Sequence, residues 1–331
     1  MRQQSFTDME YKGRRRISKR EQFLDIMEEI IPWDEWIALV EPHYFAGKRG
    51  RPPMGIEKML RMYLLQSWFN LSDEGVEDAI YDSYAMRKFM KLHFMKESVP
   101  DATTLLHFRR ILEESELGKA MFEAINRVLE QNGHMMRGGT IVDATIISAS
   151  GSVRNTDKKR DEEMSSTRKG SDWHFGMKAH VGVDAGSGLI HSLVTTTAKV
   201  QDVTQGHLLL RENDHTVYGD NGYAGIEKRP EIRDDETKRG ILFQINGRKG
   251  KLYKGELTVS SYWAREIDRQ KSRTRCKVEF VFRYLKVEFG YRKARYKGLK
   301  KNENRLFMLS ASANLLMCMR AGRNPLQPVT G

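Results

Sequence analysis

The segment TIVDATII, residues 140–147, decides the fold. Its β-branched residues are typical of a buried strand, yet Asp143 interrupts the apolar run at its centre. A carboxylate in such a strand is costly unless it is paired with a cation or binds a metal ion. The segment therefore predicts a sheet built around this strand, with Asp143 either in an ion pair with a buried lysine or at a functional site.

The residues that follow predict an α/β fold with a mixed sheet. The segment HFGMKAHVGVDAGSGLIHSLVTTTA, residues 174–198, predicts a hairpin, because its first half alternates in polarity and a glycine-containing turn follows at 184–188. The remaining elements are a helix, a strand that ends in Asp220, a further strand and a long basic helix, expected at 202–210, 215–223, 241–245 and about 274–289. This order of strands and helices is typical of the α/β class.

The first 135 residues predict an all-α region, since apolar residues recur there at helical spacing. One helix is expected to begin at Ser72 or Asp73, and another at Asp101 or Thr103, which are good N-terminal caps. The second helix would present three polar residues to solvent or to DNA: Thr104, His107 and Arg110. Short helices joined by tight turns are compatible with a helix-turn-helix, although most such pairs are packing units.

Charge is concentrated in two basic segments. The chain has 56 Lys and Arg against 44 Asp and Glu, a formal net charge of +12. Residues 265–301 hold fourteen basic residues and four acidic ones, and residues 12–20 hold six basic residues and no acid. Clustering of this kind favours a nucleic-acid partner, because each neutralised phosphate releases counterions. A solvated basic face without a partner is the alternative.

Several protein classes are excluded by composition. Two cysteines are too few for a disulfide framework or a four-cysteine zinc module, and 331 residues suffice for two domains. The richest apolar stretch, residues 307–319, is too short to span a membrane, and the N-terminus has no apolar segment typical of a secretory signal. We therefore expect a cytoplasmic protein associated with the nucleoid.

The linker GKRGRPP, residues 47–53, contains the sequence Arg49-Gly-Arg51-Pro. An extended Arg-Gly-Arg segment can lie in the narrow minor groove of A·T-rich DNA, so Arg49 and Arg51 are candidate DNA contacts. A polar loop between two helices is the alternative interpretation.

Three acids occupy unusual positions: Asp143 within a strand, Asp220 at the end of one, and Glu279 on the basic helix. On an ideal helix Glu279 shares one narrow face with Arg275 and Lys286. Converging carboxylates in a basic setting predict Mg²⁺, with Mn²⁺ as a substitute, acting on a phosphodiester through two metal ions. Taken singly, the same acids could form an ion pair, cap a turn and form a helical salt bridge.

The chain resembles the DDE transposases of bacterial insertion sequences, in particular the insertion-sequence-five-type group. The resemblance rests on segments distributed through most of the chain: LSDEGVEDAIYD, VPDATTLLHFRRIL, TIVDATII, WHFGMKAHVGVDAGSGLIHSLVTT, GDNGY and KVEFVFRYLKVEFGYRKARYKGLKKN. It implies a ribonuclease-H-like mixed-sheet catalytic domain over residues 136–331, with an insertion around 224–270. Residues 1–135 would be the helical region for DNA binding or oligomerisation.

The resemblance also implies roles for individual residues. The three family acids, which serve as catalytic residues and metal ligands, map to Asp143, Asp220 and Glu279. The superfamily pattern Tyr-x2-Arg-x3-Glu-x6-Lys is matched by Arg275, Glu279 and Lys286, but Ser272 stands at the tyrosine position. Four basic residues of the domain are expected to contact DNA: Arg275, Lys286, Arg283 and Lys178.

The function expected from these observations is that of a DNA transposase. It would bind the terminal inverted repeats of an insertion sequence, cleave the ends, and join the 3′-OH to target DNA, working as a homodimer on two ends. A catalytically silent DNA-binding repressor of the same ancestry and a stand-alone Mg²⁺-dependent nuclease are the alternatives. The histidines His174, His180 and His191 are interpreted as structural or DNA-adjacent, because their spacing does not favour a zinc site.

Overall fold

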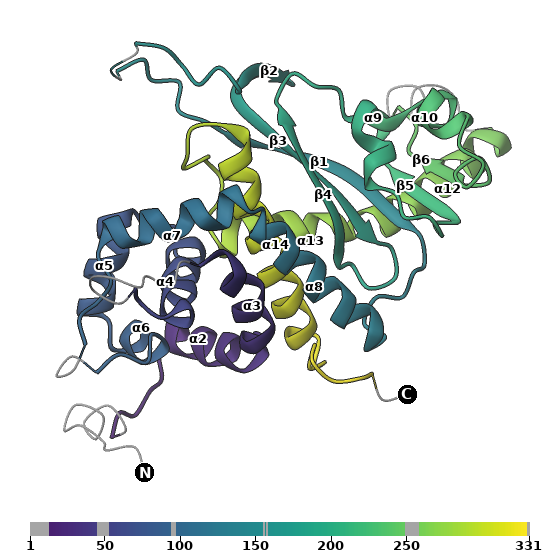
Figure 1. Cartoon of the computed structure of the whole chain (residues 1–331). Helices are drawn as coiled ribbons and strands as arrows, with labels where there is room; N and C mark the ends of the chain where they lie inside the picture. The colour runs from purple at the N-terminus through teal and green to yellow at the C-terminus, as the bar shows by residue number, and fades with distance from the viewer. Residues whose placement is uncertain are drawn as a thin grey trace.

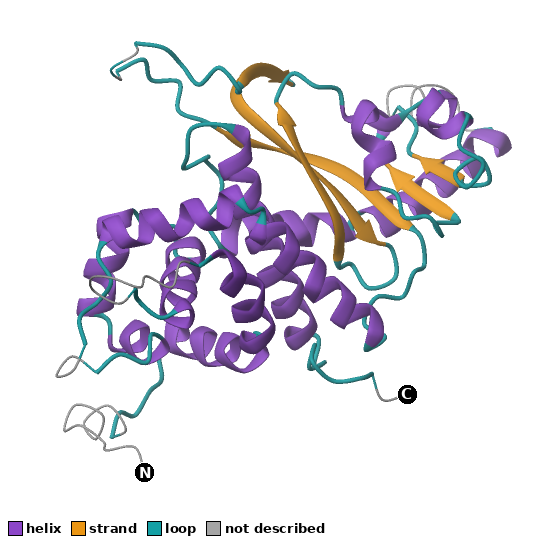
Figure 2. Cartoon of the chain, viewed as in Figure 1, coloured by secondary structure: helices purple, strands orange, loops and turns teal. Residues whose placement is uncertain are grey.

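The computed structural model describes residues 13–44, 53–93, 97–154, 156, 158–248 and 258–329. The N-terminal part is entirely helical, as the sequence predicts, and forms a bundle on one side of the molecule (Figures 1 and 2). Its helices are α2 (Lys19–Ile30), α3 (Trp33–Val40), α4 (Ile56–Trp68), α5 (Asp73–Asp82), α6 (Tyr84–Phe89), α7 (Ala102–Glu114) and α8 (Leu117–Gln131).

Side-chain caps fix where these helices begin. The Ser72 hydroxyl accepts a hydrogen bond from the backbone N–H of Gly75, and the Asp101 carboxylate accepts one from Thr104. Each cap satisfies one of the N–H groups that have no partner within the helix. The predicted starts of α5 and α7 are therefore confirmed, with Ser72 and Asp101 as the capping residues.

The second part is built on a mixed six-stranded sheet. Its strands are β1 (Thr140–Ser148), β2 (Ser165–Lys169), β3 (Asp172–Asp184), β4 (Ile190–Thr197), β5 (Thr216–Gly219) and β6 (Leu242–Ile245). The strand β3 pairs antiparallel with β1, β2 and β4, whereas β5 runs parallel to both β1 and β6. The mixed sheet is the one that the sequence pattern predicts, and its arrangement around a central β1 is the ribonuclease-H-like sheet that the family resemblance implies.

The remaining helices are shorter or more broken than the sequence predicts. The helix expected at 202–210 is α9 (Asp202–Gln205) followed by a 3₁₀ turn at Gly206–Leu209. The helix expected at about 274–289 is α13 (Lys277–Arg283) followed by a π-helical turn at Tyr284–Glu288. It is preceded by α12 (Val259–Arg275), and α10 (Pro230–Arg233) lies before β6.

The C-terminal helix α14 (Leu299–Arg320) joins the two parts of the molecule. It packs against α8, α7 and α2 on one side and against β4 on the other, and it lies between the bundle and the sheet (Figure 1). Asn314 accepts a hydrogen bond from the backbone N–H of Ile190 and donates one to its carbonyl, 2.9 and 2.7 Å long. One hydrophobic core therefore extends from the helical bundle to one face of the sheet.

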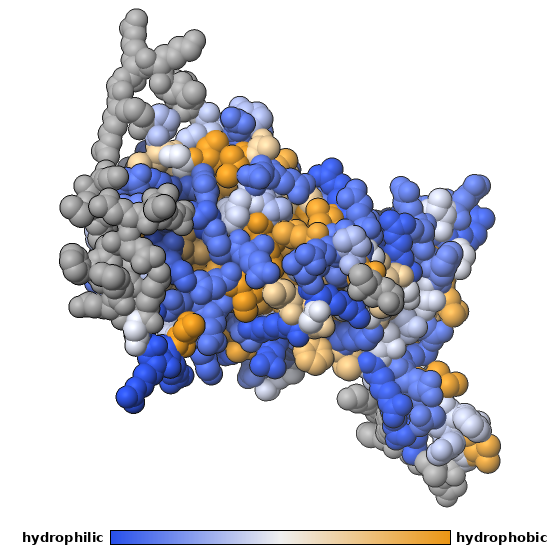
Figure 3. All heavy atoms as spheres, turned by 90° about the horizontal axis from the view of Figure 1, so that it is seen from below, coloured by the Kyte–Doolittle hydropathy of each residue, from blue (hydrophilic) through white to orange (hydrophobic). Residues whose placement is uncertain are grey.

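A second, smaller core lies on the other face of the sheet, between β1, β5 and the segments around α9 and α10. Seen from below, the surface is mostly hydrophilic, and hydrophobic side chains are exposed in scattered patches (Figure 3). Within the described ranges no helix combines the length and apolar character that a membrane span requires.

Candidate active site

The pairing of β1 with β5 brings two of the predicted acids together. The two strands are parallel, and their last paired residues are Val142 and Gly219. Asp143 and Asp220 are the next residues along each strand, so they are lateral neighbours at the carboxyl end of β5. The Asp220 carboxylate also accepts a hydrogen bond of 2.8 Å from the backbone N–H of Gly222, which fixes the turn after β5.

The Asp143 side chain is largely buried and has two hydrogen-bond donors. Its Oδ1 accepts from the backbone N–H of Ala144 at 2.8 Å, and its Oδ2 accepts from the Arg275 guanidinium at 2.9 Å. Burial, which has the largest effect, and the negative charges of Asp220 and Glu279 together raise the pKa of Asp143 to about 7, against the lowering effect of the two donors. The surroundings of the Asp143 carboxylate therefore favour the binding of a cation.

Glu279 lies on α13, within electrostatic range of Asp143. Val278 and Val281 are buried against the sheet, and Glu279 is exposed beside them. Its charge acts on Asp143 and on Lys286, which places the third acid in the electrostatic neighbourhood of the first two. The structure thus brings Asp143 and Asp220 together and places Glu279, on α13, where its charge acts on Asp143.

The donor set fits a hard divalent cation, because it consists of carboxylate oxygens and one of them is buried among like charges. In the part of the chain that the structure describes, no group of three or more His, Cys, Asp and Glu side chains is already arranged closely enough to hold a metal ion. The Arg275 guanidinium is the cation next to Asp143 in this arrangement. A metal ion would compete with it for the same carboxylate.

The helix that is expected to carry Arg275, Glu279 and Lys286 on one face is not continuous. The helix is interrupted at Cys276, where α12 ends and α13 begins, and the π-helical turn shifts the register before Lys286. The ammonium of Lys286 donates a 2.7 Å hydrogen bond to the Ile146 carbonyl of β1 and is half-buried. Lys286 therefore anchors the helix on the central strand.

Other residues predicted to bind DNA lie in different surroundings. Arg283 is exposed, with the Glu288 carboxylate 3.9 Å away, and Arg49 and Arg51 lie outside the described residues. Lys178 is paired with the Asp202 carboxylate at 2.8 Å and with the backbone carbonyl of Val200, on the β3 side of the sheet.

Ser272, at the position of the superfamily tyrosine, takes part in a local hydrogen-bond network. Its hydroxyl donates to the backbone carbonyl of Asp268 at 2.9 Å and accepts from the side chain of Asn246 at 3.0 Å. Asp268 also accepts from Asn246 and from the backbone N–H of Gly247. Ser272 therefore helps to hold α12 against the end of β6.

The three histidines interpreted as structural or DNA-adjacent lie on strands of the sheet, His174 and His180 on β3 and His191 on β4. His180 is buried on β3 with its Nε2 2.8 Å from the Thr196 hydroxyl, and His191 on β4 is bonded to Thr140 and Ser192. Burial lowers the pKa of His180 to about 4 and that of His191 to about 3. Both rings are neutral at pH 7.

One residue near the site was not predicted. Asp202 lies at the start of α9 beside the Asp220 turn, and its only sequence signal is an acid in the first turn of a short helix. That pattern is common at helix N-termini and does not distinguish a functional residue.

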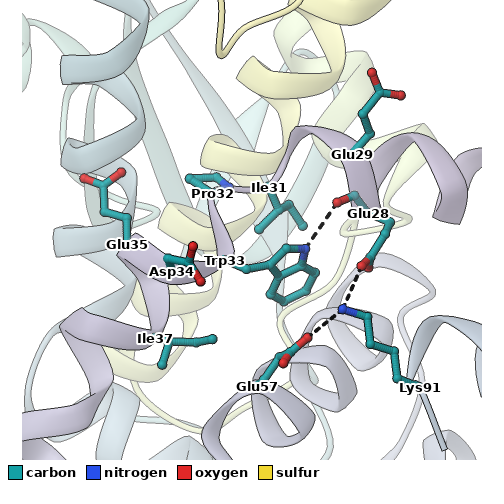
Figure 4. A pocket seen from close by; sticks show the side chains of 10 residues that line it. All are labelled: Glu28, Glu29, Ile31, Pro32, Trp33, Asp34, Glu35, Ile37, Glu57 and Lys91. Atoms are coloured by element: carbon teal, nitrogen blue, oxygen red, sulfur yellow. Dashed lines mark hydrogen bonds and ion pairs between the residues drawn. The ribbon is translucent and has the colours of Figure 1, made fainter. Parts of the chain in front are cut away.

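A separate hollow of about 600 Å³ lies in the helical region (Figure 4). Glu28 and Glu57 line it, and both carboxylates form ion pairs with Lys91, at 3.0 and 2.9 Å. The buried guanidinium of Arg61 pairs with the same two acids and lies 3.9 Å from the Trp33 ring centroid. These four charges balance one another and form a structural junction between α2 and α4, whereas Glu29, Asp34 and Glu35 line the rest of the hollow. The acids at β1 and β5 remain the candidate site.

Comparison with known proteins identifies the family. The family described as "Transposase DDE domain" matches residues 134–315, more than half of the chain, and a family described as "Transposase domain" matches residues 12–110. The chain therefore belongs to the transposases with a DDE domain. It is accordingly an enzyme, a DNA transposase, whose partner is DNA; members of this family typically use divalent metal ions.

The structure is also similar to that of the piggyBac transposase, determined by cryo-electron microscopy as a synaptic complex with hairpin DNA. The two share 11% sequence identity, the match covers 93% of this chain and 77% of that chain, and the TM-score is 0.46. Assignment to the insertion-sequence-five-type group stays a prediction from the sequence.

Proposed function

We propose that this transposase cleaves the ends of its own insertion sequence with Mg²⁺ held by Asp143, Asp220 and Glu279, and joins the freed 3′-OH to target DNA. The observation that carries the proposal is the register of β1 and β5, which makes Asp143 and Asp220 neighbours within reach of the charge of Glu279. Mn²⁺ is expected to substitute for Mg²⁺, since both prefer oxygen ligands. When bound, two such ions activate the attacking oxygen and stabilise the leaving one in an in-line displacement.

The residues around the three acids fix the helix that carries Glu279. Lys277 donates to the backbone carbonyls of Ala185 and Gly186, the latter at 2.9 Å, and Lys286 donates to β1. These contacts hold both ends of α13 and the turn after it on the sheet, so Glu279 keeps its position relative to Asp143. Rigid support of this kind lowers the cost of assembling the site when DNA binds.

Arg275 has two roles in this proposal. In the DNA-free protein its guanidinium neutralises Asp143, and its side chain is about a quarter exposed. When metal ions take over the carboxylate, the guanidinium becomes available to a DNA phosphate next to the reacting bond. Arg283, exposed at the end of α13, would contact the flanking backbone.

The helical region is proposed to recognise the terminal inverted repeats. His107 and Arg110 are exposed on α7, on the side of the helix opposite its buried residues Leu105 and Phe108.

A homodimer that pairs two ends is the proposed working form, because two ends must be joined to one target. Mass photometry with and without end DNA would test it; a 1:1 complex on paired ends would contradict it.

The central experiment compares Glu279→Gln with wild type on a duplex that carries one element end, with Mg²⁺ or Mn²⁺. The variant is expected to bind the duplex with unchanged affinity and to lose cleavage by at least about a hundredfold. Glu266→Gln, on exposed α12 and paired with Arg269, is the matched control and keeps wild-type cleavage. Wild-type cleavage by Glu279→Gln would remove Glu279 from the mechanism.

The same assay separates the alternative functions. Binding of the end duplex without any nicking, in either metal, supports the silent repressor. Cleavage without joining, when a pre-cut 3′-OH end and a target plasmid are supplied, supports the stand-alone nuclease.

A further inference from the structure

Asp202 lies next to Asp220 although the two residues belong to different segments. A Cβ atom placed on Gly222 would stand 2.8 Å from Oδ1 of Asp220 and 3.7 Å from Oδ2 of Asp202. The two carboxylate oxygens are therefore within 6.5 Å of each other, the sum of those two distances. The absence of a side chain at Gly222 keeps the space between them open.

The position of Asp202 is fixed by a lysine from the sheet. Lys178 on β3 donates to Oδ1 of Asp202 at 2.8 Å and to the Val200 carbonyl at 2.7 Å, and its side chain is largely buried. Nδ1 of His180, which lies two residues along the same strand, is 3.7 Å from the same oxygen. Asp202 thus has a specific cationic partner and is not a solvated acid at a helix terminus.

A second observation points to the same place. Tyr223 is completely buried, and its hydroxyl finds no hydrogen-bond partner among the described residues. Burial raises its pKa, and so do the charges of three carboxylates, those of Asp202, Asp143 and Asp220. A buried hydroxyl within the field of these three acids is an unsatisfied polar group, which favours a water or ligand there.

We propose that Asp202 is a fourth carboxylate of the metal-binding site, which increases the affinity of the Asp143–Asp220 pair for divalent cations, and that Lys178 is its counter-ion and limits that affinity. The inference rests on the proposed function, because it assumes that these two acids bind the cation. It replaces the predicted DNA contact of Lys178 by an electrostatic role within the protein. Asp202 acts on the cation through its charge and by its place beside Asp220.

The two members of the pair are expected to act in opposite directions. Removing the negative charge with Asp202→Asn weakens binding of Mn²⁺ to the DNA-free protein by about sevenfold, as estimated for a unit charge acting on a divalent ion at about 7 Å in a water-like dielectric. Removing the positive charge with Lys178→Met tightens it by a similar factor. The double variant Asp202→Asn/Lys178→Met, in which the net charge of the pair is unchanged, returns close to wild type.

The experiment titrates Mn²⁺ into the full-length chain without DNA and measures the affinity by calorimetry and by electron paramagnetic resonance. The matched control is the pair Lys88–Asp25 in the helical region, also 2.8 Å apart, whose variants Asp25→Asn and Lys88→Met leave the Mn²⁺ affinity unchanged. Circular dichroism melts show which variants are folded. A variant that is merely destabilised would lose affinity, so tighter binding by Lys178→Met cannot come from damage to the fold.

Failure of this inference is distinguishable from failure of the proposed function. If Asp143→Asn abolishes Mn²⁺ binding while Asp202→Asn and Lys178→Met both bind as wild type does, the role of Asp202 is refuted and the three-acid site stands. If Asp143→Asn binds Mn²⁺ as tightly as wild type, the proposed site itself is wrong, and the inference is overturned with it.

Discussion

The free energy of unfolding is expected to fall as the pH is lowered, and the variant His191→Gln is expected to show a much smaller fall than wild type. The neighbours of His191 fix the ring in one neutral form. The Thr140 hydroxyl donates to Asp214 at 2.6 Å, so it accepts from Nε2–H of His191 at 2.9 Å, and Nδ1 lies 2.8 Å from the Ser192 hydroxyl, which donates to it. Protonating Nδ1 would break the last bond and place a buried cation near Arg211.

The magnitude follows from the pKa values. Burial lowers the pKa of His191 to about 3, whereas a histidine in the unfolded chain has a pKa of about 6.5. The neutral His191 ring therefore makes its full contribution to the free energy of unfolding above about pH 6.5. This contribution is lost as the pH falls towards 3. At pH 5 the unfolded state has bound nearly one proton at this residue and the folded state almost none, which costs about 2 kcal/mol relative to pH 8.

The assay is urea unfolding followed by circular dichroism at pH 8, 7, 6 and 5. Glutamine keeps an N–H donor but has no charge to gain, so His191→Gln is expected to lose about 2 kcal/mol less than wild type between pH 8 and 5. His215→Gln, at an exposed position, is the control and keeps the wild-type slope. An unchanged slope in His191→Gln would refute the view that the ring is held neutral by burial.

Three other substitutions or reagents test the packing. A Cβ at Gly118 would lie 2.6 Å from the backbone oxygen of Asn304, so Gly118→Ala is expected to destabilise the α8–α14 contact by about 1–3 kcal/mol, measured by urea unfolding; a stabilised variant would contradict the packing. Cys276 is exposed and is expected to react with a thiol reagent in the native state, whereas Cys318 is buried with its pKa raised to about 12 and reacts only on unfolding; equal rates would be inconsistent with this. Replacing the buried Arg61 with methionine leaves the two acids of the α2–α4 junction with one cation fewer, and we expect a loss of about 2 kcal/mol of unfolding free energy, which an unchanged denaturation midpoint would disprove.

The sheet was predictable where the residues carry a burial signal. The strand β1 with Asp143 inside it, the β3–β4 hairpin and the strand that ends before Asp220 follow from β-branched runs, alternation and turn residues, whereas the parallel pairing that makes the two acids neighbours comes from the structure. The strand β2 was missed because its residues, Ser165–Lys169, are polar and mostly exposed and pair only with β3 at the edge of the sheet. An edge strand that is held mainly by backbone hydrogen bonds needs no alternation of apolar and polar residues, so the hydropathy pattern does not predict it.

The interruption of the basic helix was not predictable from its apolar spacing. Periodicity averages over several turns, so it does not reveal the end of α12 at Arg275 or the one-residue insertion of the π-helical turn. Nor did it predict α12 itself, which is polar and begins with a reciprocal capping box between Thr258 and Ser261. The role of Asp202 depends on a contact with Lys178, 24 residues away, which no local pattern shows.

The buried polar residues of α14 give the strongest argument about how the two parts of the molecule work together. Arg305 is completely buried and donates to the backbone carbonyl of Ser67 and to the side chain of Asn70 at the end of α4. Asn70 in turn donates to the carbonyl of Gly290, just beyond the π-helical turn that follows Glu279. The predicted boundary at residue 135 thus marks a change of secondary structure within a continuous core. Because the same helix is bonded to the bundle and to β4, DNA held by α7 would lie at a fixed distance from Asp143 and Asp220, and a fragment starting at residue 136 would expose the apolar surface that α8 and α4 now cover.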